Sequence, residues 1–285
     1  MKLFRATIIV ALVVLAVSGA ASSVTNSDVQ SRVNADIAEG KPIVVHVVVA
    51  LCDNVNQGIV PVPKALGNGQ DPKSNLYWGA LYGVRTHLPR SANWTRLDIL
   101  RPADTRILER VVMYAEVNRD QLAVPVYIVA DAWDGAKIRE AMITYLEMTA
   151  GRASETVTVK RHSETHALQA GGASHVVVYV GHNGLMDFRL ETPSPASKES
   201  PAKSAIILAC ASKSHFVDHL HTTGAHPLLL TTGLMAPEAY TLDSALRSWI
   251  AKGTTAAAIE GAARAYNRYQ KCGVGPARRL FWGQQ

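Results

Sequence analysis

Two apolar runs in the chain each end at a side chain that can take part in nucleophilic chemistry. The run SHVVVYVGHNG, residues 174–184, leads to His182, and the run AIILACAS, residues 205–212, leads to Cys210. A cysteine attacks a carbonyl as a thiolate, and a histidine beside it is the usual base. We therefore consider His182 and Cys210 as a candidate catalytic dyad. Each also has a simpler interpretation, as a structural histidine and as a buried cysteine acting as a small apolar residue.

A dyad requires that the two strands lie side by side, and the order of elements predicts that they do. Apolar runs of strand length alternate with segments of helical periodicity, which favours a mostly parallel sheet with helices on both faces, an α/β fold. The expected strands cover residues 43–52, 95–100, 109–117, 124–135, 174–182, 205–210 and 227–233. The expected helices cover residues 75–88, 136–151, 215–224, 243–253 and 254–272, and the polar stretch 154–173 is expected to be a loop.

Ligands of open α/β sheets bind at the carboxyl ends of the strands. Functional groups stand at several of these predicted ends, so a parallel sheet would collect them at one edge. They are Cys52 with Asp53 and Asn54, Asp131 with Asp134, His182 with Asn183 and Gly184, and Cys210 with Ser212. The backbone N–H groups of Gly184 and Cys210 are candidate donors to an oxyanion.

The pair VVVYVGHNG and IILACAS resembles the caspase-like cysteine peptidases, which include caspases, metacaspases, legumains, gingipains and clostripains. The resemblance implies a caspase-like fold in which the two strands are adjacent. It also implies that Cys210 is the nucleophile and His182 the general base and acid, with no cofactor or metal required. Asn183 stands between the histidine and the glycine, and Leu208 precedes Ala-Cys, where the family has other residues. An inactive caspase-like domain that serves as a binding or scaffold module is therefore the alternative.

The same resemblance assigns substrate-binding residues. The end of the first strand helps to line the pocket for the P1 residue, and Asp53 stands there, which favours an Arg or Lys at P1 by charge pairing. The alternative is that Asp53 caps a turn. Asn183 and Ser212 are the further candidates for substrate binding. The expected partner is a peptide or protein substrate.

Other groups of polar residues carry weaker hypotheses. His215 and His219 have a spacing that can bind zinc on one helix face, and His221 follows them, but a solvated helix face is the favoured interpretation. Asp131 and Asp134 are either a carboxylate pair of another kind of hydrolase or carbohydrate-active protein, or caps of the helix that follows. No phosphate-binding glycine motif or serine-hydrolase motif is present.

The composition and the N-terminus set the context. The chain has 285 residues, 48% hydrophobic and 18% charged, with a net charge of +6. Its basic residues are scattered, which argues against nucleic-acid binding. Residues 1–21 have the basic start, apolar centre and small-residue end of a signal peptide, so we expect an exported protein, periplasmic or extracellular, with no membrane span after cleavage. An uncleaved anchor is the alternative. A polar segment, 22–40, would then precede a single domain, 41–285.

The three cysteines, Cys52, Cys210 and Cys272, all lie beyond the predicted signal peptide. An odd number leaves one thiol free in an oxidising compartment or paired between chains. We therefore consider a disulfide between Cys52 and Cys272, which would leave Cys210 free. The number of subunits cannot be predicted from the sequence.

Overall fold

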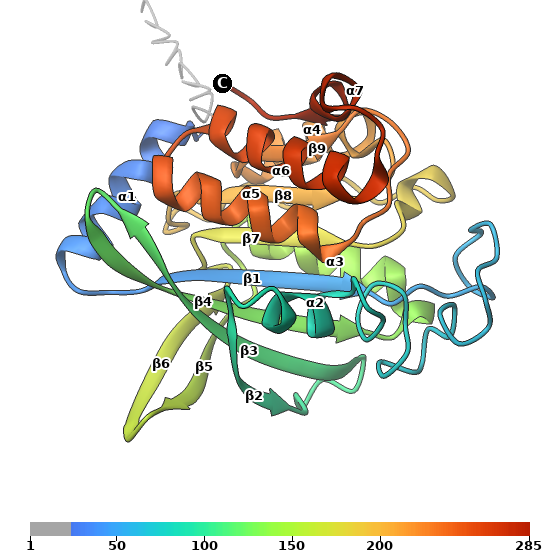
Figure 1. Ribbon diagram of the computed structural model, residues 1–285, viewed down its shortest axis with the longest axis horizontal. Coiled ribbons are helices and arrows are strands. Elements are labelled where there is room, and N and C mark those ends of the chain that lie inside the picture. The colour runs from blue at the N-terminus through green and yellow to red at the C-terminus, as the bar shows by residue number, and fades with distance from the viewer. Residues whose placement is uncertain (1–23) are drawn as a thin grey trace, which may run out of the picture.

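A computed structural model describes residues 24–285, and an eight-stranded mixed sheet runs through its centre (Figure 1). Across the sheet the strands follow the order β10-β9-β8-β7-β1-β4-β3-β2, and β5 and β6 form a separate hairpin. The strand bounds are β1 Ile43–Ala50, β2 Thr95–Leu100, β3 Ile107–Arg119, β4 Leu122–Trp133, β5 Ser154–Arg161, β6 Glu164–Gly171, β7 Val176–Val180, β8 Ser204–Leu208, β9 His226–Thr231 and β10 Phe281–Trp282.

The helices connect these strands and cover the sheet. Their bounds are α1 Asn26–Ala38, α2 Val84–Arg90, α3 Ile138–Thr149, α4 Ser212–Thr223, α5 Ala239–Lys252, α6 Thr255–Gln270 and α7 Val274–Leu280, with short 3₁₀ turns η1 Gly135–Lys137 and η2 Gly184–Met186. Among residues 24–285, no helix is both long and apolar enough to cross a bilayer. The predicted signal peptide lies outside the described residues.

Five neighbouring strands, β9, β8, β7, β1 and β4, are parallel, and β10, β3 and β2 pair antiparallel at the two sides. After β1 the chain forms β2, β3 and β4, which all lie on one side of β1. It then crosses to β7, on the other side of β1. This reversal makes the gap between β1 and β7 a topological switch point. In such sheets the crevice at the carboxyl ends beside the switch point is where ligands bind.

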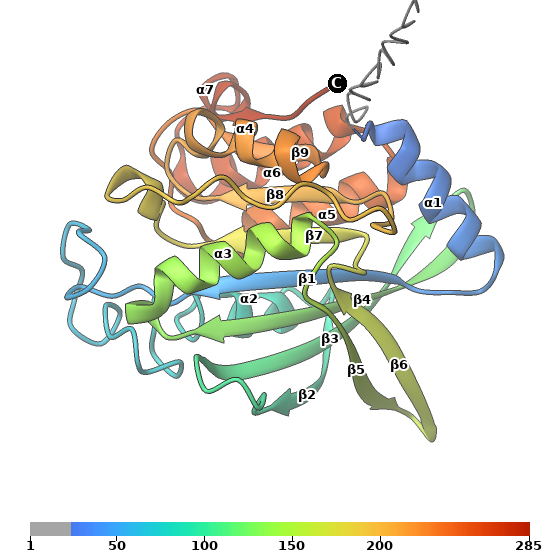
Figure 2. The same cartoon turned by 180° about the vertical axis from the view of Figure 1, so that it is seen from behind.

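The strands at the centre are almost continuously apolar because both of their faces are covered. In β1 every residue of IVVHVVVA is buried. On one face, Val45, Val47 and Val49 share a core with α2, α5 and α6, which lie over the sheet in Figure 1. On the other face, Val48 and Ala50 pack with α3 and α4, which lie in front in Figure 2.

Most of the elements predicted from the sequence are confirmed, and two predictions are wrong. Residues 154–173 are mainly the β5–β6 hairpin, not a loop. The helix predicted over 75–88 begins only at Val84, because residues 75–83 form a series of turns. The mostly parallel sheet is confirmed in its centre. The short α7 and β10 were not predicted.

The β5–β6 hairpin is fastened to the sheet by a buried ionic network. Arg110 of β3 donates to Asp131 of β4 at 2.6 and 2.8 Å and to Glu155 of β5 at 2.7 and 2.8 Å. His46 of β1 lies 3.1 Å from Asp131 through Nε2 and accepts the Gly171 N–H at Nδ1. Because burial makes an unpaired charge costly, these groups hold each other in place.

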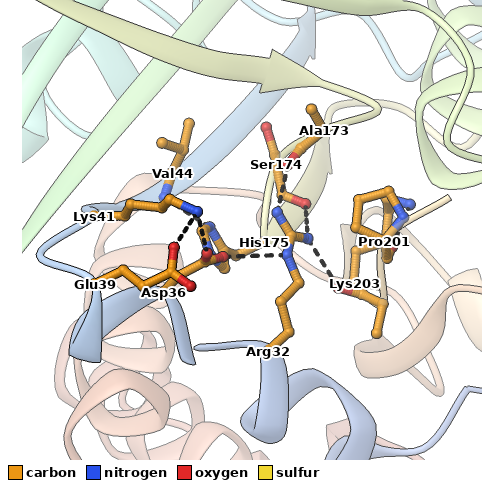
Figure 3. Close-up of polar contacts among 11 residues, drawn as sticks. Arg32, Asp36, Glu39, Lys41, Val44, Ala173, Ser174, His175, Pro201 and Lys203 are labelled. Carbon is orange, nitrogen blue, oxygen red and sulfur yellow. Dashed lines mark hydrogen bonds and ion pairs between the residues drawn. The ribbon is translucent and has the colours of Figure 1, made fainter. Parts of the chain in front are cut away.

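Helix α1 is attached across the amino ends of β7 and β8, far from the carboxyl edge (Figures 1 and 3). Arg32 donates to the carbonyls of Ala173, Ser174 and Ala202, and Asp36 lies 3.0 Å from His175 Nε2. His175 Nδ1 accepts the Val44 N–H, so this ring is held between the helix and the sheet. The polar segment 22–40, for which either a frayed segment or a short helix was expected, thus contains a regular helix.

Candidate active site at the carboxyl edge of the sheet

His182 and Cys210 follow adjacent parallel strands and lie at the same edge of the sheet. β7 pairs with β8 up to Val180 and Leu208, and the Gly181 N–H then donates to the Leu208 carbonyl at 3.2 Å. Beyond this point the Asn183 side chain donates from Nδ2 to the Cys210 carbonyl at 2.7 Å. The hydrogen bonds between the strands therefore continue through the candidate residues themselves.

The His182 ring is oriented by an acidic side chain five residues further along. Its Nε2 lies 2.5 Å from Asp187 Oδ2, and η2 makes the tight turn that brings Asp187 back to the ring. The Tyr179 hydroxyl donates to the His182 carbonyl at 2.8 Å, which fixes the backbone. His182 Nδ1 makes no hydrogen bond within residues 24–285. With Nε2 donating to Asp187, Nδ1 is the nitrogen available to a substrate.

Cys210 lies at a sharp turn between β8 and α4. Ala211, which follows it, has φ 48° and ψ 35°, in the left-handed region that non-glycine residues rarely adopt. Cys210 is partly exposed at this turn. It directly precedes Ala211, the N-cap residue of α4, and the helix begins at Ser212. The Met235 N–H points at Cys210 Sγ from 3.4 Å. The Cys210 thiol in turn donates to the Met235 carbonyl at 3.6 Å, so both backbone groups of Met235 contact the sulfur.

Backbone N–H groups beside the dyad are open to an oxyanion. Neither the Gly184 N–H nor the Cys210 N–H donates a hydrogen bond to another described residue. Gly184 is buried, and a Cβ at this position would lie 2.6 Å from the Phe188 ring. A larger residue here would therefore require the Phe188 ring to move. These two amides are the donors that the sequence predicted for an oxyanion.

The long segment after β1, residues 51–83, extends past the carboxyl edge beside this site (Figure 1). Asn75 anchors it, accepting the Cys52 N–H at 3.0 Å and donating to the Cys52 carbonyl at 2.8 Å. Gly58 lies against the Asp187 carboxylate, with 3.3 Å between its ideal Cβ position and Oδ1. This segment therefore lies against the acidic side chain that orients His182.

The structure does not contain the disulfide that was considered from the sequence. All three are free: Cys52 is buried, Cys210 is partly exposed and Cys272 is exposed after α6. The proposed Cys52–Cys272 bridge is therefore absent from the structure. Burial raises the pKa of the Cys52 thiol to about 11, so this thiol stays protonated at neutral pH. Cys210 is the cysteine that follows the strand paired with β7, which leads to His182.

The side chains predicted to bind substrate already make hydrogen bonds to other groups of the protein. The Asp53 carboxylate accepts hydrogen bonds from the backbone N–H groups of Val55 and Asn56 and from the side chains of Asn56 and Gln70. This is the turn-capping alternative. The hydrogen bonds lower the pKa of Asp53 against the opposing effect of burial.

Asn183 and Ser212 are fully buried. Asn183 uses both ends of its amide, since its Oδ1 accepts the Leu185 N–H at 3.1 Å. The Ser212 hydroxyl donates to the Ile207 carbonyl at 3.0 Å and lies 3.1 Å from the Thr231 hydroxyl. Both side chains join neighbouring elements at the edge, and Asn183 also contacts Cys210.

The residues of the weaker hypotheses make no hydrogen bond or ion pair with the candidate dyad. Asp131 is buried in the ionic network with Arg110, and Asp134 caps η1 by accepting the Ala136 N–H at 2.9 Å. The capping alternative is therefore confirmed for Asp134, and the two carboxylates do not act as a pair. The histidines of α4 belong to no potential metal cluster among the described residues. His46, Asp131 and Glu155 do come together, but Arg110 already binds both carboxylates.

Sequence reasoning missed Asp187 and Met235, the two residues that contact the dyad from outside the motifs. Asp187 follows His182 closely enough that the HNGLMD stretch carried a signal. Met235 reaches Cys210 through its backbone, so its side-chain type carried none. Comparisons with protein-family models, with curated proteins and with solved structures found no match to this chain.

Proposed function

We propose that the protein is an exported cysteine endopeptidase of caspase-like fold that uses a His182–Cys210 dyad. The observation that carries the proposal is the junction of the two strand ends, where Asn183 holds the Cys210 carbonyl and Asp187 orients His182. The order of the parallel strands and the position beside the switch point agree with it.

The proposed reaction proceeds in two steps. The Cys210 thiolate attacks the scissile carbonyl carbon, and the Gly184 and Cys210 amides stabilise the oxyanion that forms. The C–N bond then breaks, the amine leaves with a proton from His182, and a thioester remains on Cys210. A water molecule gives a proton to His182 and attacks the thioester, and the C–S bond breaks, which releases the carboxylic acid and restores the Cys210 thiolate and the protonated His182. Asp187 stabilises the imidazolium form of His182, which is present before the amine leaves and again after the water molecule has attacked.

An inactive caspase-like domain with a binding role is the second candidate. It is favoured by Asn183, which displaces Gly184 by one position from the histidine, and by the Met235 N–H that already contacts the Cys210 sulfur. Both candidates share the fold, so only the chemistry of Cys210 distinguishes them.

Hydrolysis of reporter peptides tests the proposed reaction. Peptides ending in Arg, Lys, Asp and Asn before the reporter should show whether Asp53 confers a basic P1 preference. Cleavage should disappear in Cys210→Ala and fall at least a hundredfold in His182→Ala, because general acid–base catalysis typically contributes about 10²–10⁴. The matched control is Cys272→Ala, which removes an exposed thiol elsewhere. Cleavage that persists in Cys210→Ala would refute the proposal.

A further inference from the structure

A cavity of about 780 Å³ lies between α2, β3, α5 and α6. In Figure 1 these two long helices, α5 and α6, lie over one face of the sheet. Its walls come from His87 and Ser91 of the α2 region, from residues 116–118 of β3, and from one side of α5 and α6. No residue of the candidate active site lines it. The volume is in the range of small-molecule sites.

Four basic side chains line this cavity. Arg247 and Lys252 come from α5, and Arg264 and Arg268 come from α6. Arg264 pairs with Glu260 at 2.5 Å. Arg247, Lys252 and Arg268 have no acidic partner within 4.0 Å among residues 24–285, so three cations face the cavity without a counter-ion.

The two acidic residues of the walls do not neutralise these cations. The Asp243 carboxylate is buried and accepts hydrogen bonds from Asn93 at 3.0 Å and from the Trp94 indole at 2.8 Å. Glu116 accepts the Tyr114 hydroxyl at 2.6 Å. Since Arg264 is already paired with Glu260, three unpaired basic groups stand against two acidic groups, which leaves the walls with a small net positive charge that attracts anions into a concave site.

The floor is aromatic and preformed. The Tyr240 and Tyr269 rings stack with centroids 4.1 Å apart and planes 9° apart, and the His87 ring meets Tyr269 edge-on at 5.8 Å. Burial lowers the pKa of His87, so this ring is neutral at physiological pH. The aromatic cluster gives the basic side chains a rigid support.

We propose that this cavity binds a small molecule that carries more than one phosphate-type group. Arginine guanidinium groups match phosphate oxygens with two parallel hydrogen bonds. Arg264 and Arg268 are one helical turn apart on α6, and Arg247 and Lys252 face the cavity from α5. Because the cations lie on two different helices, a ligand with two linked anionic groups can contact both helices, whereas a single anionic group cannot contact both as well.

Calorimetric titration of the full-length mature protein with sodium pyrophosphate and with inorganic phosphate tests this site. Pyrophosphate should bind saturably at one site per chain and more tightly than phosphate. Arg247→Ala/Arg268→Ala should weaken pyrophosphate binding by at least about tenfold, since each removes a charge-assisted contact. The matched control is Arg96→Ala/Lys160→Ala, which removes two exposed cations of β2 and β5 outside the cavity.

The control should bind pyrophosphate like the parent protein, and both double variants should keep the parent circular dichroism spectrum and melting temperature. The proposal is overturned if pyrophosphate does not bind saturably, if phosphate binds as tightly, or if the two double variants lose affinity equally. Unchanged binding in Arg247→Ala/Arg268→Ala would also overturn it. None of these results depends on peptidase activity.

Discussion

At the scale of single residues, Asn183 is the side chain on which the geometry of the dyad most depends. It interrupts the His-Gly sequence that the caspase-like resemblance leads one to expect, yet its amide is the only side chain that joins the end of β7 to Cys210 in the described structure. The residue that separates His182 from Gly184 therefore also holds the two strand ends together.

Asn183→Ala should lower both stability and the reactivity of Cys210. The substitution leaves the Cys210 carbonyl and the Leu185 N–H without their partner, which costs about 1–3 kcal/mol in a buried setting. Urea unfolding measures the first effect and alkylation of Cys210 the second. Asn118→Ala, on an exposed position of β3 whose side chain makes no hydrogen bond within residues 24–285, is the control and should change neither. A fully stable, fully reactive Asn183→Ala protein would contradict this role.

Only part of the candidate site could be predicted from residues alone. His182, Gly184 and Cys210 stand directly at the ends of apolar runs, so alternation of elements was enough to place them at one edge. Asp53 and Ser212 were selected by the same rule, but the rule does not reveal whether a polar side chain faces the crevice or the protein. The Met235 contact to Cys210 arises from tertiary structure and leaves no local pattern.

At the scale of elements, the turn from β8 into α4 determines how Cys210 is presented. Ala211 adopts φ 48°, a conformation that costs a non-glycine residue roughly 1 kcal/mol. Ala211→Gly should therefore leave stability unchanged or raise it by up to about 1 kcal/mol. Ala211→Val should lower stability, because a β-branched residue tolerates this region least. Equal urea midpoints for the two variants would contradict this account of the turn.

The β5–β6 hairpin depends on the ionic network beneath it. Arg110→Met leaves the buried Asp131 carboxylate without its main partner and should cost about 3–5 kcal/mol. Glu155→Gln should cost much less, because the Glu155 side chain is 37% exposed whereas Asp131 is fully buried. Hydrogen exchange should show faster opening of β5 and β6 in Arg110→Met. Similar unfolding energies for the two variants would argue against the network.

The hairpin also shows why some elements escaped prediction. Val157 and Val159 in β5 and Leu168 and Ala170 in β6 alternate with polar residues and form a small core of their own against the sheet. A polar stretch with so few apolar residues is typical of a loop. Only the contacts with the sheet show that these residues form strands. The opposite error occurred at residues 75–83, where helical spacing of apolar residues was outweighed by Gly79 and Gly83 and by turns anchored at Asn75.

At the scale of the whole molecule, two buried histidines make stability depend on pH. Burial lowers the pKa of His175 and of His226 to about 4. Between pH 6.5 and 4 the unfolded chain therefore binds more protons than the folded chain, so the free energy of unfolding must fall as the pH falls through this range. These two rings lie at the amino ends of the sheet, away from the dyad.

Thermal unfolding between pH 7.5 and 4 measures this effect. The melting temperature should decrease steadily below pH 6.5, and His226→Gln should make the decrease shallower, because it removes one of the rings whose pKa burial lowers to about 4. His215→Gln, which changes a histidine of α4, should keep the parent slope. A melting temperature that is constant or rises down to pH 4.5 would contradict the assigned burial of His175 and His226.

The alkylation rate of each cysteine by iodoacetamide, mapped by mass spectrometry in the folded protein, is the most direct test of the dyad. The account predicts that Cys210 reacts faster than the exposed Cys272, and that His182→Ala slows Cys210 at least about tenfold while Cys272 keeps its rate. A Cys210 that is unreactive in the folded protein, or that reacts at the same rate with and without His182, would contradict the proposed peptidase.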